Sequence, residues 1–113
     1  MFSFSMRSIV SEVEAKLRPP DEGPGSGKAE RKSYKHGGEQ LKIMMRQLDL
    51  PDHSRVDIFL DGSPIGSGAI AGGACTLKLR SEAGQGVPYI MAGQEIDILH
   101  SGQVLLKGVF KPD

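Results

Sequence analysis

Three histidines and one cysteine are the side chains best suited to metal binding or nucleophilic catalysis. None of His36, His53 and His100 lies at a ligand spacing from another histidine or from Cys75. A zinc site needs three or four such ligands at short spacings, so its signature is absent. Cys75 alternates with two leucines, which predicts a small buried thiol and not an activated nucleophile. We therefore expect no metal, no cofactor and no catalytic residue.

Aspartates gather around the first turn of the second half of the chain. They lack the spacing of a calcium-binding loop, so turn chemistry and a polar outer face explain them best. One alternative remains, because catalytic sets are geometric and are not visible in spacing. In it, Asp52, His53 and the rest of the 49–57 loop region line a small-ligand or hydrolytic site.

The stretch Gly25-Ser26-Gly27-Lys28 has the glycines and the lysine of a phosphate-binding loop. Glu22 stands where the first glycine belongs, and Ala29 replaces the required serine or threonine. No strand is predicted to precede the stretch, as that motif requires. The sequence therefore argues against a phosphate-binding loop here.

The composition argues against several classes of partner. Lys and Arg number 14, as do Asp and Glu, so there is no net charge to attract nucleic acid or an acidic membrane over distance. The chain has no tryptophan and few aromatic residues for a base-stacking platform. A single cysteine fits a reducing compartment, and no apolar run approaches the length of a membrane span. We expect a cytoplasmic protein that does not bind nucleic acid.

Residues 1–18 are expected to form an amphipathic helix that ends at Pro19-Pro20. Its apolar residues recur at a spacing of three to four: Met6, Ile9, Val10, Val13 and Leu17. Residues 19–38 contain many prolines, glycines and charges and almost nothing apolar, which predicts a flexible linker. The helix would dock on a protein, with contact to a membrane surface as the alternative.

Residues 39–113 carry the pattern of β-strands. Arg55–Ile70 predicts a hairpin, because its apolar residues alternate around Asp61-Gly62, a pair suited to a type I′ turn. Residues 39–50 match both helix and strand, and we choose strand because a meander into the hairpin is the simplest connection. Further strands are expected at 75–80, 95–99 and 104–110, with the 81–94 connection leading to the other sheet.

About six short strands with regular turn signals predict a mainly β protein, a small antiparallel β-sandwich. The pattern V-x-I-x-L-x-G-x-x-I-G, followed by V-P-x-I-x-x-G-Q, is similar to small immunoglobulin-like or transthyretin-like sandwiches over residues 39–110. This resemblance implies a fold and carries no function.

The predicted function is a non-catalytic interaction module that self-associates. A domain of this size is stable only by a narrow margin, which favours an oligomer. Phe59 is expected on the face opposite the buried residues of its strand, and Val87, Tyr89 and Met91 form a candidate recognition tip. The alternatives are a cargo protein addressed by its helix to a membrane or assembly, and the ligand-binding site in the 49–57 region.

Overall fold

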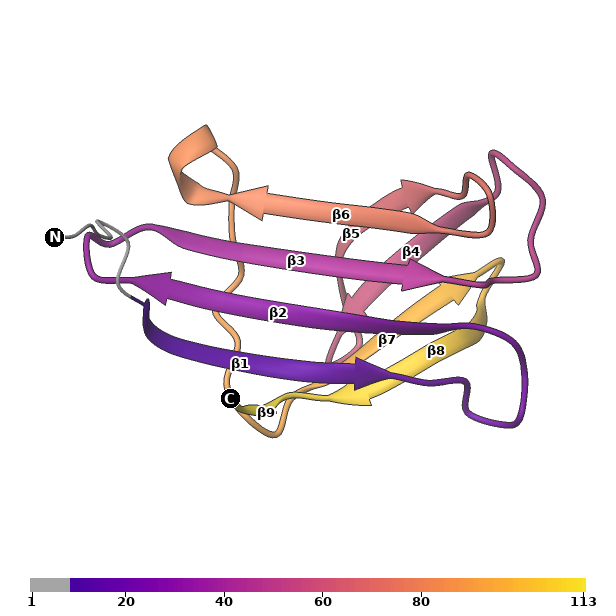
Figure 1. The fold of residues 1–113 in the computed structure, drawn as a ribbon, viewed down its shortest axis with the longest axis horizontal. Coiled ribbons are helices and arrows are strands. Elements are labelled where there is room, and N and C mark those ends of the chain that lie inside the picture. The colour runs from indigo at the N-terminus through magenta and orange to yellow at the C-terminus, as the bar shows by residue number, and fades with distance from the viewer. Residues whose placement is uncertain (1–8) are drawn as a thin grey trace, which may run out of the picture.

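Two antiparallel sheets packed face to face form the fold in the computed structural model, which describes residues 9–113 (Figure 1). Sheet A has the order β6 (Cys75–Arg80), β3 (Glu39–Arg46), β2 (Ser26–Tyr34), β1 (Ile9–Leu17) and β9 (Lys111–Pro112). Sheet B has the order β5 (Ser63–Ala69), β4 (Arg55–Leu60), β7 (Glu95–His100) and β8 (Gln103–Val109). The prediction of a mainly β, two-sheet antiparallel protein is confirmed.

The core lies between the sheets, because each long strand turns alternate residues inward. β3 contributes Leu41, Ile43 and Met45, and β4 contributes Val56, Ile58 and Leu60, all of them buried. The remaining buried apolar side chains complete a single cluster: Ala15, Leu17, Ala29, Leu48, Ile70, Ile90, Ile96, Ile98, Leu106 and Phe110. The residues between these on the strands point outward and are largely charged.

The prediction of an N-terminal helix is wrong over residues 9–17, which form β1. Val13, Ala15 and Leu17 face the core, whereas Glu14 and Lys16 between them point outward, so the segment also has the period of two that defines a strand. β1 pairs with β2 along its length, and this pairing decides the conformation where local spacing fits either structure. Met6 lies outside the described residues.

The prediction of a flexible linker over 19–38 is wrong for its second half, because β2 occupies Ser26–Tyr34 between β1 and β3. Its inward positions hold Gly27 and Ala29, which are small because the space is small. A Cβ added at Gly27 would lie 2.5 Å from the Met44 carbonyl oxygen. The absence of large apolar residues therefore reflected tight packing and not disorder, and the sheet begins well before residue 39.

The predicted hairpins are confirmed. β4 and β5 join through Asp61 and Gly62, whose φ angles of 47° and 83° are those of a type I′ turn. β7 and β8 also pair as a hairpin. Residues 39–46 are a strand as predicted, but the reason given for it is wrong. β3 does not continue as a meander into the hairpin, because β3 pairs with β2 and β6 in sheet A while β4 and β5 lie in sheet B. The 81–94 connection crosses between the sheets, as predicted.

Glycines allow the two sheets to approach closely at both sides of the sandwich. On one side, a Cβ at Gly68 would lie 2.5 Å from Cys75 Sγ on β6. On the other side, Gly108 lies against the Lys16 carbonyl group, and the backbones of Arg18 and Lys107 exchange hydrogen bonds of 3.0 and 2.8 Å. The described residues include no helix long and apolar enough to span a membrane.

Candidate functional site

Lysines lie directly opposite one another at two places on the outer face of sheet A. Lys16 on β1 is the cross-strand partner of Lys28 on β2, and Lys42 on β3 is the partner of Lys78 on β6. All four positions alternate with inward-facing core residues, so the side chains share one surface. Like charges placed directly across an antiparallel pair are destabilising.

Positive charge dominates this surface, which we call the cationic face. It holds nine of the chain's Lys and Arg residues: Lys16, Arg18, Lys28, Lys32, Lys42, Arg46, Lys78, Arg80 and Lys111. The same strands carry three carboxylates on this face: Glu12, Glu14 and Glu30. The outer face of sheet B has the opposite balance, with Asp57, Glu95 and Asp97 against Arg55 and Lys107. A net charge of zero therefore conceals two surfaces of opposite sign.

The three carboxylates occupy one corner of the cationic face. One oxygen from each lies within 4.8 Å of the others, which is close enough for the three to hold a metal ion. Lys28 Nζ, however, lies 3.3 Å from Glu14 and 3.2 Å from Glu30, and both contacts raise the pKa of the lysine. Burial and a hydrogen bond to Asp113 raise the pKa of Glu12. This corner is therefore already neutralised by the protein itself.

The β3–β6 side of the face is less fully neutralised, because Glu30 stands directly across from Lys42 but forms its ion pair with Lys28. The pKa of Lys78 is lowered, first by the charge of Arg80 and then by burial and by the charge of Lys42. Within residues 9–113, no carboxylate forms an ion pair with any of these three cations. The lowered pKa of Lys78 therefore reports mutual repulsion among these three cations.

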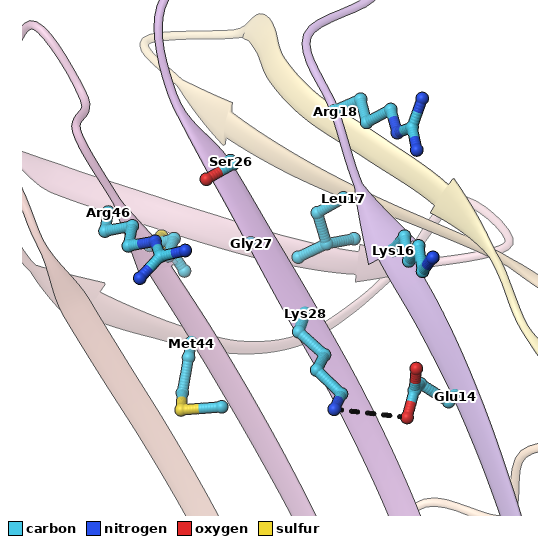
Figure 2. A pocket seen from close by; sticks show the side chains of 10 residues that line it. Glu14, Lys16, Leu17, Arg18, Ser26, Gly27, Lys28, Met44 and Arg46 are labelled. Carbon is cyan, nitrogen blue, oxygen red and sulfur yellow. Dashed lines mark ion pairs between the residues drawn. The ribbon is translucent and has the colours of Figure 1, made fainter.

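A hollow of about 450 Å³ lies at the end of the cationic face where β1 leaves sheet A (Figure 2). Arg46 stands on one side of it and Lys16 and Arg18 on the other, with Ser26 and Gly27 between them. The remaining lining comes from Glu14, Leu17, Lys28, Met44 and Met45.

Arg31 is the one buried charged side chain among the described residues, with 3% of its surface exposed. It points inward from β2 and donates hydrogen bonds to the Pro88 carbonyl oxygen at 3.0 Å and to Glu39 Oε2 at 3.0 Å. Its remaining nitrogen donates to Ser33 Oγ, and its guanidinium lies 5.4 Å from the centre of the Tyr89 ring. Arg31 thus fastens the 81–94 connection across one end of the sandwich.

The interaction residues predicted from the sequence do not lie on one surface. Leu17 is in the core, and Val13 and Val87 pack partly buried against it. Ile9 and Val10 are exposed on the first half of β1. Phe59 lies half-buried on the outer face of sheet B. At the tip of the 81–94 connection, Tyr89 is 71% exposed and Met91 55% exposed.

The residues suggested for a small-ligand site serve the turns in which they lie. Asp52 accepts a hydrogen bond of 2.9 Å from the Gly72 amide, and the His53 amide donates to the Ile70 carbonyl oxygen. His53 has a φ of 74°, a backbone conformation typical of a turn. Burial raises the pKa of the Cys75 thiol, which opposes thiolate formation.

The sequence prediction missed the cationic face because it treated residues 19–38 as linker. The sequence does contain the signal, because Lys28, Glu30 and Lys32 occupy every second position of β2. On β3, Lys42 and Arg46 have the same alternation, with Met44 between them. Comparison of the chain with protein-family models and with curated proteins finds no match.

Proposed function

We propose that the chain is a non-catalytic binding module that holds a nucleic acid by its phosphate backbone, through the cationic face of sheet A. The observation that carries the proposal is the cross-strand register that sets Lys42 directly opposite Lys78, and Lys16 opposite Lys28. The first pair carries more weight, because Lys28 is offset by Glu14 and Glu30 whereas Lys42 and Lys78 have no ion-paired carboxylate within residues 9–113. A sheet with such pairs gives up stability when it is free. An anion lying over the lysines restores it, and phosphates spaced along a polymer are suited to do so.

The chemistry of the face favours a nucleic acid over a membrane or an acidic protein. Residues 12–18, 26–32, 40–46 and 76–80 contain no aromatic side chain. Aromatic anchors usually dominate protein interfaces, and peripheral membrane contact needs apolar side chains that enter the lipid. Charge alone is sufficient for contact with a phosphate backbone.

The same observation restricts the mode of binding. Proteins that grip single strands without sequence preference stack successive bases on several aromatic rings, whereas the described strands of sheet A carry one aromatic residue, Tyr34 at the end of β2. Contacts to phosphate position a protein on nucleic acid but carry no sequence information. We therefore expect binding to a duplex that is independent of sequence and strongly dependent on salt.

The first test replaces one lysine pair. The double variant Lys42→Gln and Lys78→Gln is expected to bind a short DNA duplex about tenfold more weakly, because two phosphate contacts are lost. Fluorescence anisotropy of a labelled duplex at low salt measures the affinity. Thermal unfolding of the variant is expected at the same temperature or above, since the substitution removes a repulsive pair.

A matched control removes the same charge from sheet B. Arg55→Gln with Lys107→Gln changes the net charge equally, but both side chains lie on the opposite outer face. This control is expected to bind the duplex as the unmodified protein does. Equal weakening by both double variants would show that overall charge, and not the cationic face, governs binding.

Self-association remains a second proposal, supported by the exposed Tyr89 and Met91 and tested by the solution mass of the full chain. The docking helix is no part of it, because residues 9–17 are a strand. The immunoglobulin-like or transthyretin-like class of the sandwich and a cytoplasmic location likewise remain predictions from the sequence.

A further inference from the structure

The hollow on the cationic face brings cations that have no ion-pairing carboxylate among the described residues together around one depression. Lys28 is held by Glu14 and Glu30, but within residues 9–113 no carboxylate forms an ion pair with Lys16, Arg18 or Arg46. Three cations therefore surround one depression of about 450 Å³ (Figure 2). A group that accepts hydrogen bonds from all three must carry several negatively charged oxygens.

The hollow exists because β2 starts with two small residues. Ser26 and Gly27 fill little space between the neighbouring strands, and the half-buried thioether of Met44 supplies the apolar lining. Leu17 and Met45 lie behind it in the core, with 1% and 2% of their surface exposed. The site thus combines an anion-binding rim with an apolar base. A simple inorganic ion would use the rim and leave the apolar base empty, whereas a larger organic anion would use both.

We propose that this hollow binds a phosphate monoester attached to a flat or apolar body, such as a nucleoside. A terminal phosphate carries close to two charges at neutral pH and three acceptor oxygens, one for each uncompensated cation. Arginine also stacks on flat rings, which suits Arg18 and Arg46 to a base beside the phosphate. The ligand is either the 5′-phosphorylated end of a nucleic acid or a free nucleoside monophosphate.

The first of these sources rests on the proposed function, because it needs a nucleic acid on the cationic face. The experiment compares two duplexes that are identical except for a 5′-phosphate or a 5′-hydroxyl, and in parallel adenosine monophosphate and adenosine. The full-length protein is expected to bind the phosphorylated duplex about tenfold more tightly than the hydroxyl form. The ratio of these two affinities reports binding of the terminal phosphate alone, because the rest of the cationic face contacts both duplexes equally.

Two double variants test whether the preference for the 5′-phosphate arises in the hollow. Arg18→Gln with Arg46→Gln is expected to bring the ratio close to one, since it removes two of the three uncompensated cations. Lys42→Gln with Lys78→Gln is expected to weaken both duplexes and leave the ratio unchanged, because neither lysine lines the hollow. A ratio that falls equally in both variants would contradict the assignment to the hollow.

The outcomes separate this inference from the proposed function. Equal affinities for the two duplexes, together with equal affinities for adenosine monophosphate and adenosine, overturn the inference and leave backbone binding intact. Equal duplex affinities with preferential binding of adenosine monophosphate assign the hollow to the free nucleotide. If neither duplex binds, backbone binding fails, and the nucleotide titration alone tests the hollow. Binding of adenosine monophosphate but not of adenosine supports the hollow as a nucleotide site. Binding of neither compound overturns the inference. If both the phosphorylated end and the free nucleotide bind, their relative affinities identify the preferred source.

Discussion

Deletion of residues 1–38 is expected to unfold the protein. The deletion removes β1 and β2, and β2 lies at the centre of sheet A between β1 and β3. The inner face of β3 and the sheet B residues opposite it would lose the cover of Leu17 and Ala29. Far-ultraviolet circular dichroism and a thermal melt of the truncated chain measure the outcome. A cooperative transition near that of the full chain would contradict the sheet order.

Two point variants in β1 supply a graded comparison. Leu17→Ala is expected to lower the free energy of unfolding by about 2–5 kcal/mol, because the side chain is 1% exposed and leaves a cavity. Val10→Ala in the same strand is expected to change it by no more than about 0.5 kcal/mol, since that side chain is 66% exposed. A helix with both residues on one apolar face would give similar effects for the two.

Replacement of Arg31 by alanine is expected to lower the free energy of unfolding by about 3 kcal/mol. The loss has two sources: a cavity under the 81–94 connection, and the unpaired Pro88 carbonyl and Glu39 carboxylate left beside it. Glu39 is partly exposed and can regain water, which keeps the loss below that of a fully buried pair.

Urea unfolding measures the stability of Arg31→Ala, and amide hydrogen exchange over residues 87–91 reports whether the connection is released. Arg55→Ala is the matched control, because Arg55 also pairs with a carboxylate, Asp57, but with 73% of its side chain exposed. The control is expected to leave the unfolding midpoint nearly unchanged. Similar midpoints for the two variants would show that Arg31 does not fasten the end of the sandwich.

The second half of the fold could be predicted from the sequence because its strands carry large apolar residues and strong turn signals. Val56, Ile58 and Leu60 alternate with polar residues, and Asp61-Gly62 fixes the turn. The first half lacks both features. β2 turns Gly27, Ala29 and a buried arginine inward, so counting apolar residues does not reveal a strand. Its conformation depends on pairing with β1 and β3, which lie on either side of it.

The cationic face could not be predicted from the sequence for a related reason. A net charge of zero describes the whole chain, whereas binding depends on how the charges are distributed over its surfaces. The segregation on sheet A appears only when the register is known, because that register places Lys28 opposite Lys16 and Lys78 opposite Lys42. Arg31 was likewise counted among the solvated charges of a linker, although it is buried.

The most direct test of phosphate-backbone binding by the cationic face is the salt dependence of duplex affinity. We expect the logarithm of the association constant of the full-length protein to fall linearly with the logarithm of salt concentration, with a slope of about −4 or steeper, as several phosphate contacts require. The variant Lys42→Gln with Lys78→Gln is expected to reduce that slope by about two. No measurable binding at low salt, or a slope near zero, would contradict the proposed function.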